Sequence, residues 1–313
     1  MMAKLKDLAQ MEDRLVAGHG MCLGCGIPLI MKIVLRATED PLIVANATGC
    51  LEVCTTIFPR TSWNISWVHS AFENAASTIA GVESMYQALK KKGRIPQDKK
   101  VKFLGIGGDG GTYDIGLQAL SGAMERGHDI VYLCYDNNAY ANTGGQRSSA
   151  TPVGASATTS PSGTQSPGKL QRRKDLTKVM AAHGIPYAAQ ASPGRWKDLY
   201  NKAKKAFEVE GPAFLNVLCL CPTEWKYDEA KGLQLAQDAV DTCVWPLYEV
   251  ENGKYKINYK PRKKKPITEW LKPQGRFRHL FKEENASVIQ RIQKEIDEEW
   301  EELNRLAGFS QQK

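Results

Sequence analysis

Short apolar runs alternate with longer amphipathic stretches through the first two thirds of the chain. Runs of about six apolar residues are typical of buried strands, and apolar residues spaced three or four apart are typical of helices. This pattern predicts strands over residues 42–47, 101–106, 130–135, 187–190 and 213–219, and helices over residues 27–38, 72–92, 113–126, 175–183 and 195–209. Because a helix separates consecutive strands, the pattern indicates an α/β fold, doubly wound around a mostly parallel sheet.

The end of the chain has a different composition. Residues 255–265 are basic and poor in strand signals, whereas residues 284–306 show the acidic, amphipathic pattern of a surface helix. We therefore predict an α/β domain over residues 1–244 and a C-terminal extension over residues 245–313, an arm and helix for subunit contacts. The basic run at 262–265 is interpreted as a solvated or subunit-facing strip, not as a site for nucleic acid.

A long polar segment interrupts the predicted α/β pattern at residues 143–168. Nineteen of these 26 residues are Ser, Thr, Gly or Pro. Such a composition is typical of a flexible linker, but loops of this length inside an α/β domain are often lids over a functional site. The sequence leaves both interpretations open.

Composition and charge narrow the class of protein. The chain has 313 residues, 42% of them hydrophobic, and a formal net charge of +8, which suits a globular protein with acidic partners but does not demand nucleic acid. The lysines near the start are not followed by an apolar stretch, so we expect neither secretion nor a membrane span. Eight cysteines are too few for a disulfide-dense scaffold, and we expect a reducing cytoplasm.

Two predicted strands end in residues suited to a metal and a phosphate. Gly108, Asp109, Gly110 and Gly111 follow one strand, and the Asp-Asn-Asn sequence at 136–138 follows the next. Glycines let the backbone approach a phosphate, and carboxylate and amide oxygens suit Mg²⁺. From these residues alone, a tight structural turn remains the competing interpretation.

The cysteines form a second group of candidate ligands. Cys22 and Cys25 are separated by two residues, Cys50 follows another glycine, and Cys219 and Cys221 alternate at the end of a predicted strand. A redox dithiol leaves Cys50 and Cys221 unexplained, and a zinc knuckle fits the late pair poorly. The spacing alone leaves open an iron–sulfur cluster, a zinc site and buried structural thiols.

The spacing of the first group resembles that of thiamine-diphosphate-dependent enzymes, in which Gly-Asp-Gly is followed after a helix and a strand by Asn. Here Asn137 follows Asp109 by 28 residues. The resemblance implies that the side chains of Asp109 and Asn137 and the carbonyl of Ala139 bind Mg²⁺. It further implies that three glycines leave room for the diphosphate, namely Gly108, Gly110 and Gly111.

Nearly the whole chain resembles the β subunit of pyruvate:ferredoxin oxidoreductase. The segments that carry this resemblance are residues 18–26 (GHGMCLGCG), 47–52 (ATGCLE), 69–74 (HSAFEN), 142–147 (NTGGQR) and 274–278 (QGRFR). It implies that Cys22, Cys25, Cys50 and Cys221 bind one [4Fe-4S] cluster. It also implies that Gly49 and Glu52 contact the cofactor and that Asn142 faces the reacting carbon.

The same resemblance implies a multi-subunit enzyme. The expected reaction is oxidative decarboxylation of pyruvate with coenzyme A to acetyl-CoA, CO₂ and reduced ferredoxin, with an α subunit completing the active site and γ and δ subunits, or a fused equivalent, carrying electrons. The same machinery acting on another 2-oxoacid, or on oxalate without coenzyme A, is the alternative. A non-redox thiamine enzyme and a zinc-stapled scaffold are the further alternatives from other classes.

Overall fold

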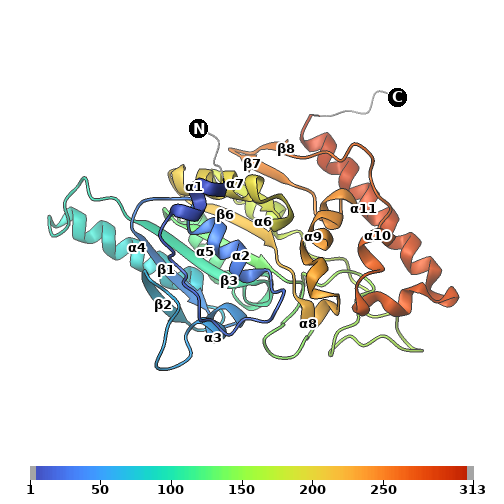
Figure 1. Cartoon of the computed structure of the whole chain (residues 1–313). Helices are drawn as coiled ribbons and strands as arrows, with labels where there is room; N and C mark the ends of the chain where they lie inside the picture. Colours follow the sequence, from blue (N-terminus) through green and yellow to red (C-terminus); the bar gives the residue numbers. More distant parts are fainter. Residues whose placement is uncertain (1–4, 309–313) are drawn as a thin grey trace.

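The computed structural model describes residues 5–308, which form a single eight-stranded sheet with helices on both faces (Figure 1). The strand order is β2-β1-β3-β4-β6-β5-β7-β8. The strands are β1 (Leu42–Ala47), β2 (Ser66–Ser70), β3 (Lys102–Gly108), β4 (Val131–Asp136), β5 (Tyr187–Ala191), β6 (Ala213–Leu218), β7 (Tyr248–Glu251) and β8 (Lys254–Ile257). The strands β1 to β6 pair in parallel, and β7 and β8 add an antiparallel edge. The predicted α/β class and doubly wound, mostly parallel sheet are confirmed.

Two hydrophobic cores cover the two faces of the sheet. On one face α2 (Ile27–Val34) and α7 (Trp196–Glu208) pack on the side chains of alternate strand positions. On the other face lie α4 (Ala75–Lys91), α5 (Leu117–Glu125) and α6 (Leu176–Ala181). Because both faces are covered, the central strands are apolar throughout, which is why their runs were readable in the sequence.

The remaining helices are short or lie at the periphery, apart from the last one. They are α1 (Leu5–Gln10), α3 (Cys50–Thr55), α8 (Pro222–Trp225), α9 (Gly232–Asp241), α10 (Thr268–Leu271) and α11 (Ala286–Leu306), with short 3-10 turns between several of them. In the described residues, none of the helices combines the length and the apolar character needed to cross a membrane.

The helix predicted at 113–126 begins earlier and is interrupted. Residues Gly110–Ile115 form a π-helical turn, in which the Gly116 amide donates to the Gly111 carbonyl at 2.9 Å, and α5 follows. A Cβ at Gly116 would lie 2.2 Å from that carbonyl oxygen, so only glycine fits. Single π turns of this kind often occur at functional sites.

The prediction for the C-terminal part missed two strands. The strands β7 and β8 lie beyond residue 244, yet they extend the sheet from β5. A third core joins α9 to α10 and α11 through Trp245, Trp270 and Ile292. Residues on both sides of position 244 share the sheet and this core. The domain boundary at 244 stays a prediction.

The polar segment at 143–168 is packed against the body rather than free. Ser148 and Ala155 have no exposed surface, and Thr151 is 2% exposed. The backbone amide of Ser156 donates to the Arg276 carbonyl at 3.0 Å, which ties the segment to the C-terminal part. The linker interpretation is therefore wrong for this segment.

Candidate functional site

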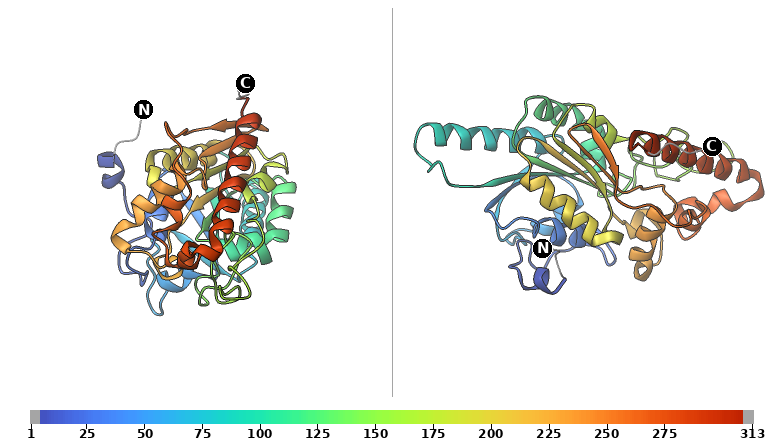
Figure 2. Two further views of the ribbon diagram at one scale, coloured as in Figure 1. Left: turned by 90° about the vertical axis from the view of Figure 1, so that its right-hand side faces the viewer. Right: turned by 90° about the horizontal axis from the view of Figure 1, so that it is seen from above.

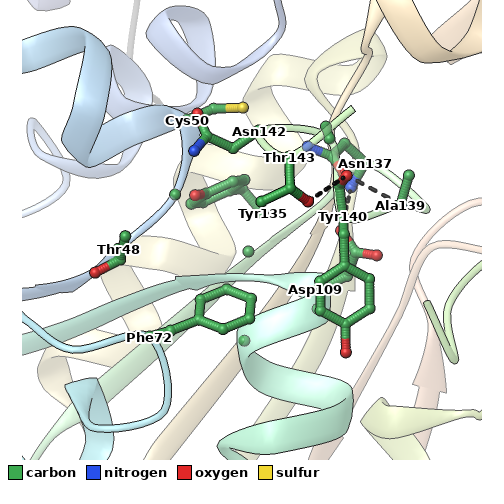
Figure 3. Close-up of a pocket in the computed structure, with 15 residues that line it drawn as sticks. Thr48, Cys50, Phe72, Asp109, Tyr135, Asn137, Ala139, Tyr140, Asn142 and Thr143 are labelled. Atoms are coloured by element: carbon green, nitrogen blue, oxygen red, sulfur yellow. Dashed lines mark hydrogen bonds between the residues drawn. The ribbon is translucent and has the colours of Figure 1, made fainter. Parts of the chain in front are cut away.

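A cavity of about 240 Å³ opens at the carboxyl ends of β1, β3 and β4 (Figure 3). In a doubly wound sheet this edge is where ligands bind, because the strand ends and the following helix starts face one crevice. Adjacent parallel strands place the turns after Gly108 and Asp136 side by side. Most of the predicted site residues line the cavity, namely Gly49, Cys50, Gly108, Asp109, Gly110, Gly111, Asn137, Ala139 and Asn142.

Three oxygens converge at one side of this cavity. The end of the Asn137 side-chain amide lies 2.9 Å from Asp109 Oδ1 and 2.8 Å from the Ala139 carbonyl oxygen. Without a cation the amide gains two hydrogen bonds by turning over, so that its nitrogen faces these oxygens. Mutually facing acceptor oxygens are what a hard cation such as Mg²⁺ requires, so these residues fit the ion.

Asp109 is completely buried and its carboxylate is held by two donors. The Ser148 hydroxyl donates to Asp109 Oδ2 at 2.5 Å, and the backbone N–H of Asn137 donates to Asp109 Oδ1 at 3.2 Å. Burial raises the pKa of Asp109 well above its usual range, the nearby Asp136 carboxylate raises it further, and the Ser148 hydrogen bond lowers it. A bound cation would favour the ionised form that this burial opposes.

The glycines of the Gly-Asp-Gly-Gly turn are required by close packing. A Cβ on Gly110 would lie 2.7 Å from the Tyr140 ring, and one on Gly111 would lie 2.9 Å from the Phe72 carbonyl oxygen. The rings of Phe72 and Tyr140 are 5.8 Å apart and lie beside the cavity (Figure 3). Any side chain at these positions would displace the aromatic wall, whereas glycine leaves the turn open to the cavity.

The cysteine residues from three segments come together beside the cavity. Burial, followed by the charges of Cys221, Cys25, Cys54 and Cys22 in that order, raises the pKa of Cys50 to about 12. The first segment is fixed to the other two by backbone hydrogen bonds from Gly26 to the Leu220 carbonyl and from Gly20 to the Cys54 carbonyl.

A single metal ion and a cubane cluster make different demands on such thiols. Within residues 5–308, no group of three or more His, Cys, Asp or Glu side chains is arranged to hold one metal ion. In a cubane cluster each thiolate binds its own iron atom, so the four sulfurs need not converge on a point. Four thiols drawn from three segments around Cys50 fit that demand.

Cys219 lies deeper than Cys221. It is completely buried, and its thiol donates to the Leu220 carbonyl at 3.9 Å. Cys221 is only partly buried and directly precedes α8. The assignment of Cys221, rather than Cys219, as the late ligand stays a prediction.

Trp225 and Arg276 connect the segment that contains Cys221 to the residues around Asp109 and Asn137. The indole nitrogen of Trp225 donates to the Asn137 carbonyl at 2.7 Å. The Arg276 guanidinium stacks 4.2 Å from the Trp225 ring and donates to Asn138 Oδ1 at 3.1 Å. Arg276 is only 4% exposed, so a buried positive charge lies between the two groups.

Asn142 and Glu52 are placed differently from the other predicted site residues. Asn142 is exposed at the mouth of the cavity. Glu52 is not among the residues that line the cavity, and its carboxylate lies 3.7 Å from His69 Nδ1 and accepts a hydrogen bond from Thr56. Its contact with a cofactor stays a prediction.

Sequence reasoning missed Ser148, Arg276 and the cavity residue Tyr135 as site residues. Ser148 lies 39 positions after Asp109, and nothing in its polar surroundings distinguishes it from its neighbours. Arg276 falls within one of the segments that carried the resemblance, and that was the available signal. Tyr135 appeared only as the end of an apolar strand.

Comparison with known proteins identifies the family. The sequence profile described as "Thiamine pyrophosphate enzyme, C-terminal TPP binding domain" matches residues 47–217, more than half of the chain. A relative named pyruvate synthase subunit PorB, from Methanocaldococcus jannaschii, is 52% identical over 92% of this chain and 95% of its own length. The chain belongs to the β subunits of 2-oxoacid:ferredoxin oxidoreductases. The resemblance inferred from the motifs is thus confirmed.

Other members of this β-subunit family and one solved structure agree. A PorB subunit of pyruvate synthase from Thermotoga maritima is 46% identical over 100% of this chain and 99% of its own length. A ketoisovalerate oxidoreductase subunit VorB from Pyrococcus horikoshii is 43% identical over 95% of this chain and 94% of its own length. The solved 2-oxoglutarate:ferredoxin oxidoreductase from Magnetococcus marinus has a TM-score of 0.53 at 20% identity, covering 71% of this chain and 77% of that one, and confirms the fold.

Proposed function

We propose that this chain carries thiamine diphosphate, Mg²⁺ and one [4Fe-4S] cluster in an enzyme that oxidatively decarboxylates pyruvate. With coenzyme A the products are acetyl-CoA, CO₂ and reduced ferredoxin. One observation carries the proposal: Cys50 lines the same cavity as Asp109, Asn137 and Ala139. A thiolate cluster and a diphosphate site that share one wall suit a reaction in which electrons leave the cofactor at once.

The residues at the oxygen site would hold the metal. Asp109 and Asn137 would supply side-chain oxygens and Ala139 its carbonyl, while the hydrogen bond from Ser148 would orient the Asp109 carboxylate and favour its ionised form. When bound, thiamine diphosphate supplies the nucleophilic carbon and the electron sink for decarboxylation. Asn142, at the cavity mouth, would donate its amide to an oxygen that gains negative charge during addition.

Cys22, Cys25, Cys50 and Cys221 would hold the cluster, which when bound supplies a one-electron acceptor. Cysteines that bind a cluster must stay reduced, which suits a reducing compartment such as the cytoplasm. The positive charge of Arg276 beside Cys221 would offset the negative charge of thiolates and sulfide.

Partner chains would complete the enzyme. The cavity is open, and the described residues that line it include one carboxylate, that of Asp109. The carboxylate that activates the aminopyrimidine of thiamine and the groups that select the substrate would then come from an α subunit, with γ and δ subunits, or a fused equivalent, passing electrons to ferredoxin. We expect the isolated chain to be inactive, so substantial turnover by it alone would contradict this assignment.

The metal content of the complex tests the cluster assignment. Iron, acid-labile sulfide and the electron paramagnetic resonance signal after reduction are measured on anaerobically purified wild-type complex, on Cys221→Ser and on the matched Cys219→Ala. We expect a cubane signal that is lost or altered in Cys221→Ser and retained in Cys219→Ala. Zinc without iron, or a signal indifferent to Cys221, would overturn the assignment and favour a non-redox thiamine enzyme or a zinc-stapled scaffold.

The choice of pyruvate is tested separately by steady-state kinetics. It is supported by the PorB relatives named as subunits of pyruvate synthase, at 46% and 52% identity. The VorB relative, at 43% identity, makes a branched-chain 2-oxoacid the second candidate. We expect the highest kcat/KM for pyruvate when pyruvate, 2-oxoisovalerate, 2-oxoglutarate and oxalate are compared. A preference for another 2-oxoacid, or for oxalate without coenzyme A, would replace pyruvate but leave the machinery unchanged.

A further inference from the structure

The carboxyl end of α4 and the segment after it project from the body of the subunit. Figure 1 and the right-hand view of Figure 2 show this projection as the cyan element that extends from one side of the sheet. We call residues 90–102, which form its tip and lead back to β3, the basic arm.

The basic arm holds most of the net charge of the chain. Its 13 residues include seven Lys and Arg and only one Asp, a net of +6 out of +8 for the whole sequence. Lys91, Lys92, Arg94, Lys99 and Lys100 are all exposed. In the part of the chain that the structure describes, the ion pairs between basic and acidic side chains occur elsewhere, and none involves a residue of the arm.

The arm is held in shape by its own contacts. Lys90 Nζ donates to the Gln97 carbonyl and Gln97 Nε2 donates to the Lys90 carbonyl, both at 2.8 Å. The Lys90 ammonium also lies 5.0 Å from the centre of the Tyr86 ring, and the Tyr86 hydroxyl donates to the Lys99 carbonyl. The arm therefore presents its charges from a formed loop, which lowers the entropic cost of binding a partner.

The end of α4 accounts for only part of this charge. Lysines in the last turn of a helix interact favourably with its dipole, and that explains Lys90 and Lys91. The remaining cations lie beyond the helix. Those nearest β3 (Lys99, Lys100 and Lys102) line a groove that also contains carboxylates, namely those of Glu39, Asp40, Asp129, Glu208 and Glu210. Lys92 and Arg94 are exposed and belong to no ion pair among the described residues. Exposed positive charge on a projecting element suits an acidic binding surface.

The position of the arm indicates which acidic surface this is. α4 begins at Ala75, close to Phe72 at the cavity, and its 17 residues span about 25 Å at 1.5 Å per residue. The arm thus lies at the far end of the helix from the cavity and the cysteines. An electron acceptor must approach the cysteines, so it is not the partner expected there.

We propose that the basic arm docks onto an acidic surface of another subunit of the same enzyme complex and strengthens its assembly. The proposal rests on the proposed function only in that this chain works within a hetero-oligomer. The partner surface is a patch of Asp and Glu on protein, because a folded arm with discrete exposed cations is matched best by fixed carboxylates.

The test compares two charge reversals of equal size in the co-expressed complex. Arg94→Glu/Lys100→Glu alters the arm outside α4, and Lys254→Glu/Lys272→Glu alters two exposed lysines elsewhere. Assembly is measured by size-exclusion chromatography with mass determination between about 0.05 M and about 0.5 M salt, a range over which screening of exposed charges changes strongly. Melting temperatures of the isolated subunits check that both variants fold.

We expect the arm variant to dissociate at lower salt than wild type, with an apparent Kd about tenfold higher at low salt, and the control variant to behave like wild type. Equal weakening in both variants, or no weakening in the arm variant, would overturn the proposal. The proposal would also be overturned if the weaker assembly of the arm variant came from loss of bound nucleic acid, which nuclease treatment reveals, or from loss of self-association of this chain. If the basic arm acts only in assembly, the iron and thiamine contents of the arm variant equal those of wild type. Absence of iron and thiamine from the wild-type complex would contradict the proposed function and not the role of the arm.

Discussion

Ser148 holds the carboxylate on which the proposed metal site depends, and Ser148→Ala isolates that contact. The hydroxyl donates to Asp109 Oδ2 at 2.5 Å, and both residues are completely buried. Hydrogen bonds to charged groups contribute about 1.5–3 kcal/mol, and a loss of about 2 kcal/mol corresponds to roughly thirtyfold weaker binding. We therefore expect the complex to bind Mg²⁺ and thiamine diphosphate about thirtyfold more weakly after this substitution.

The pH dependence of binding gives a second readout with a defined sign. Burial and then Asp136 raise the pKa of Asp109, while Ser148 lowers it. Removing the hydroxyl raises this pKa further, so protons compete with the cation up to a higher pH. The pH at which half of the binding affinity is lost should shift upward in Ser148→Ala relative to wild type.

The assay is calorimetric titration of the complex with Mg²⁺ and thiamine diphosphate after chelation and dialysis. Ser149→Ala is the matched control, because its hydroxyl donates to the carboxylate of Asp114 in the same segment, away from Asp109. Binding of wild-type strength by Ser148→Ala, or equal weakening by Ser149→Ala, would refute the reasoning.

Four further substitutions test other parts of the structure. Arg276→Met should lower the reduction potential of the cluster, because a unit charge at about 10 Å and an effective dielectric constant of about 20 contributes about 1.7 kcal/mol, or about 70 mV, to reduction by one electron. An unchanged potential in a redox titration followed by paramagnetic resonance would contradict this. Burial raises the pKa of Glu249, but hydrogen bonds from Tyr187 and Lys256 outweigh burial and bring this pKa to about 2. The contribution of the ionised Glu249 to stability is therefore present above about pH 4.5 and is lost as the pH falls towards 2. Acid unfolding of Glu249→Gln should be flatter over that range, and a curve that parallels wild type would oppose it. Gly26→Ala should destabilise the chain and reduce its iron content, because the new Cβ would lie 2.7 Å from the Leu220 amide nitrogen. Gly81 has open space around it, so Gly81→Ala should instead stabilise α4 by about 0.5–1 kcal/mol. Melting temperatures and iron analysis compare the two variants.

The buried strands were predictable because hydrophobicity is a local property. The runs at 42–47, 130–135 and 213–219 correspond closely to β1, β4 and β6, since both faces of these strands are covered. The edge strand β2 escaped notice because most of its side chains are exposed or half-buried. The strand β7 was missed because its pairing with β5 joins residues about sixty positions apart, and β8 joins the sheet only by pairing with β7.

The amino-acid sequence by itself determined the alternation of strands and helices, the glycine-rich turn at Asp109, the paired spacing with Asn137 and the family to which these motifs belong. Each of these depends on residues that are neighbours or are separated by one helix and one strand. Only the tertiary structure decided that the segment at 143–168 is packed and that Ser148 reaches Asp109. It also decided that Cys219 is completely buried and that the end of α4, with the basic residues around it, projects from the body. Those facts depend on how distant segments pack, because burial and electrostatic contact are set by the whole fold and not by any local pattern.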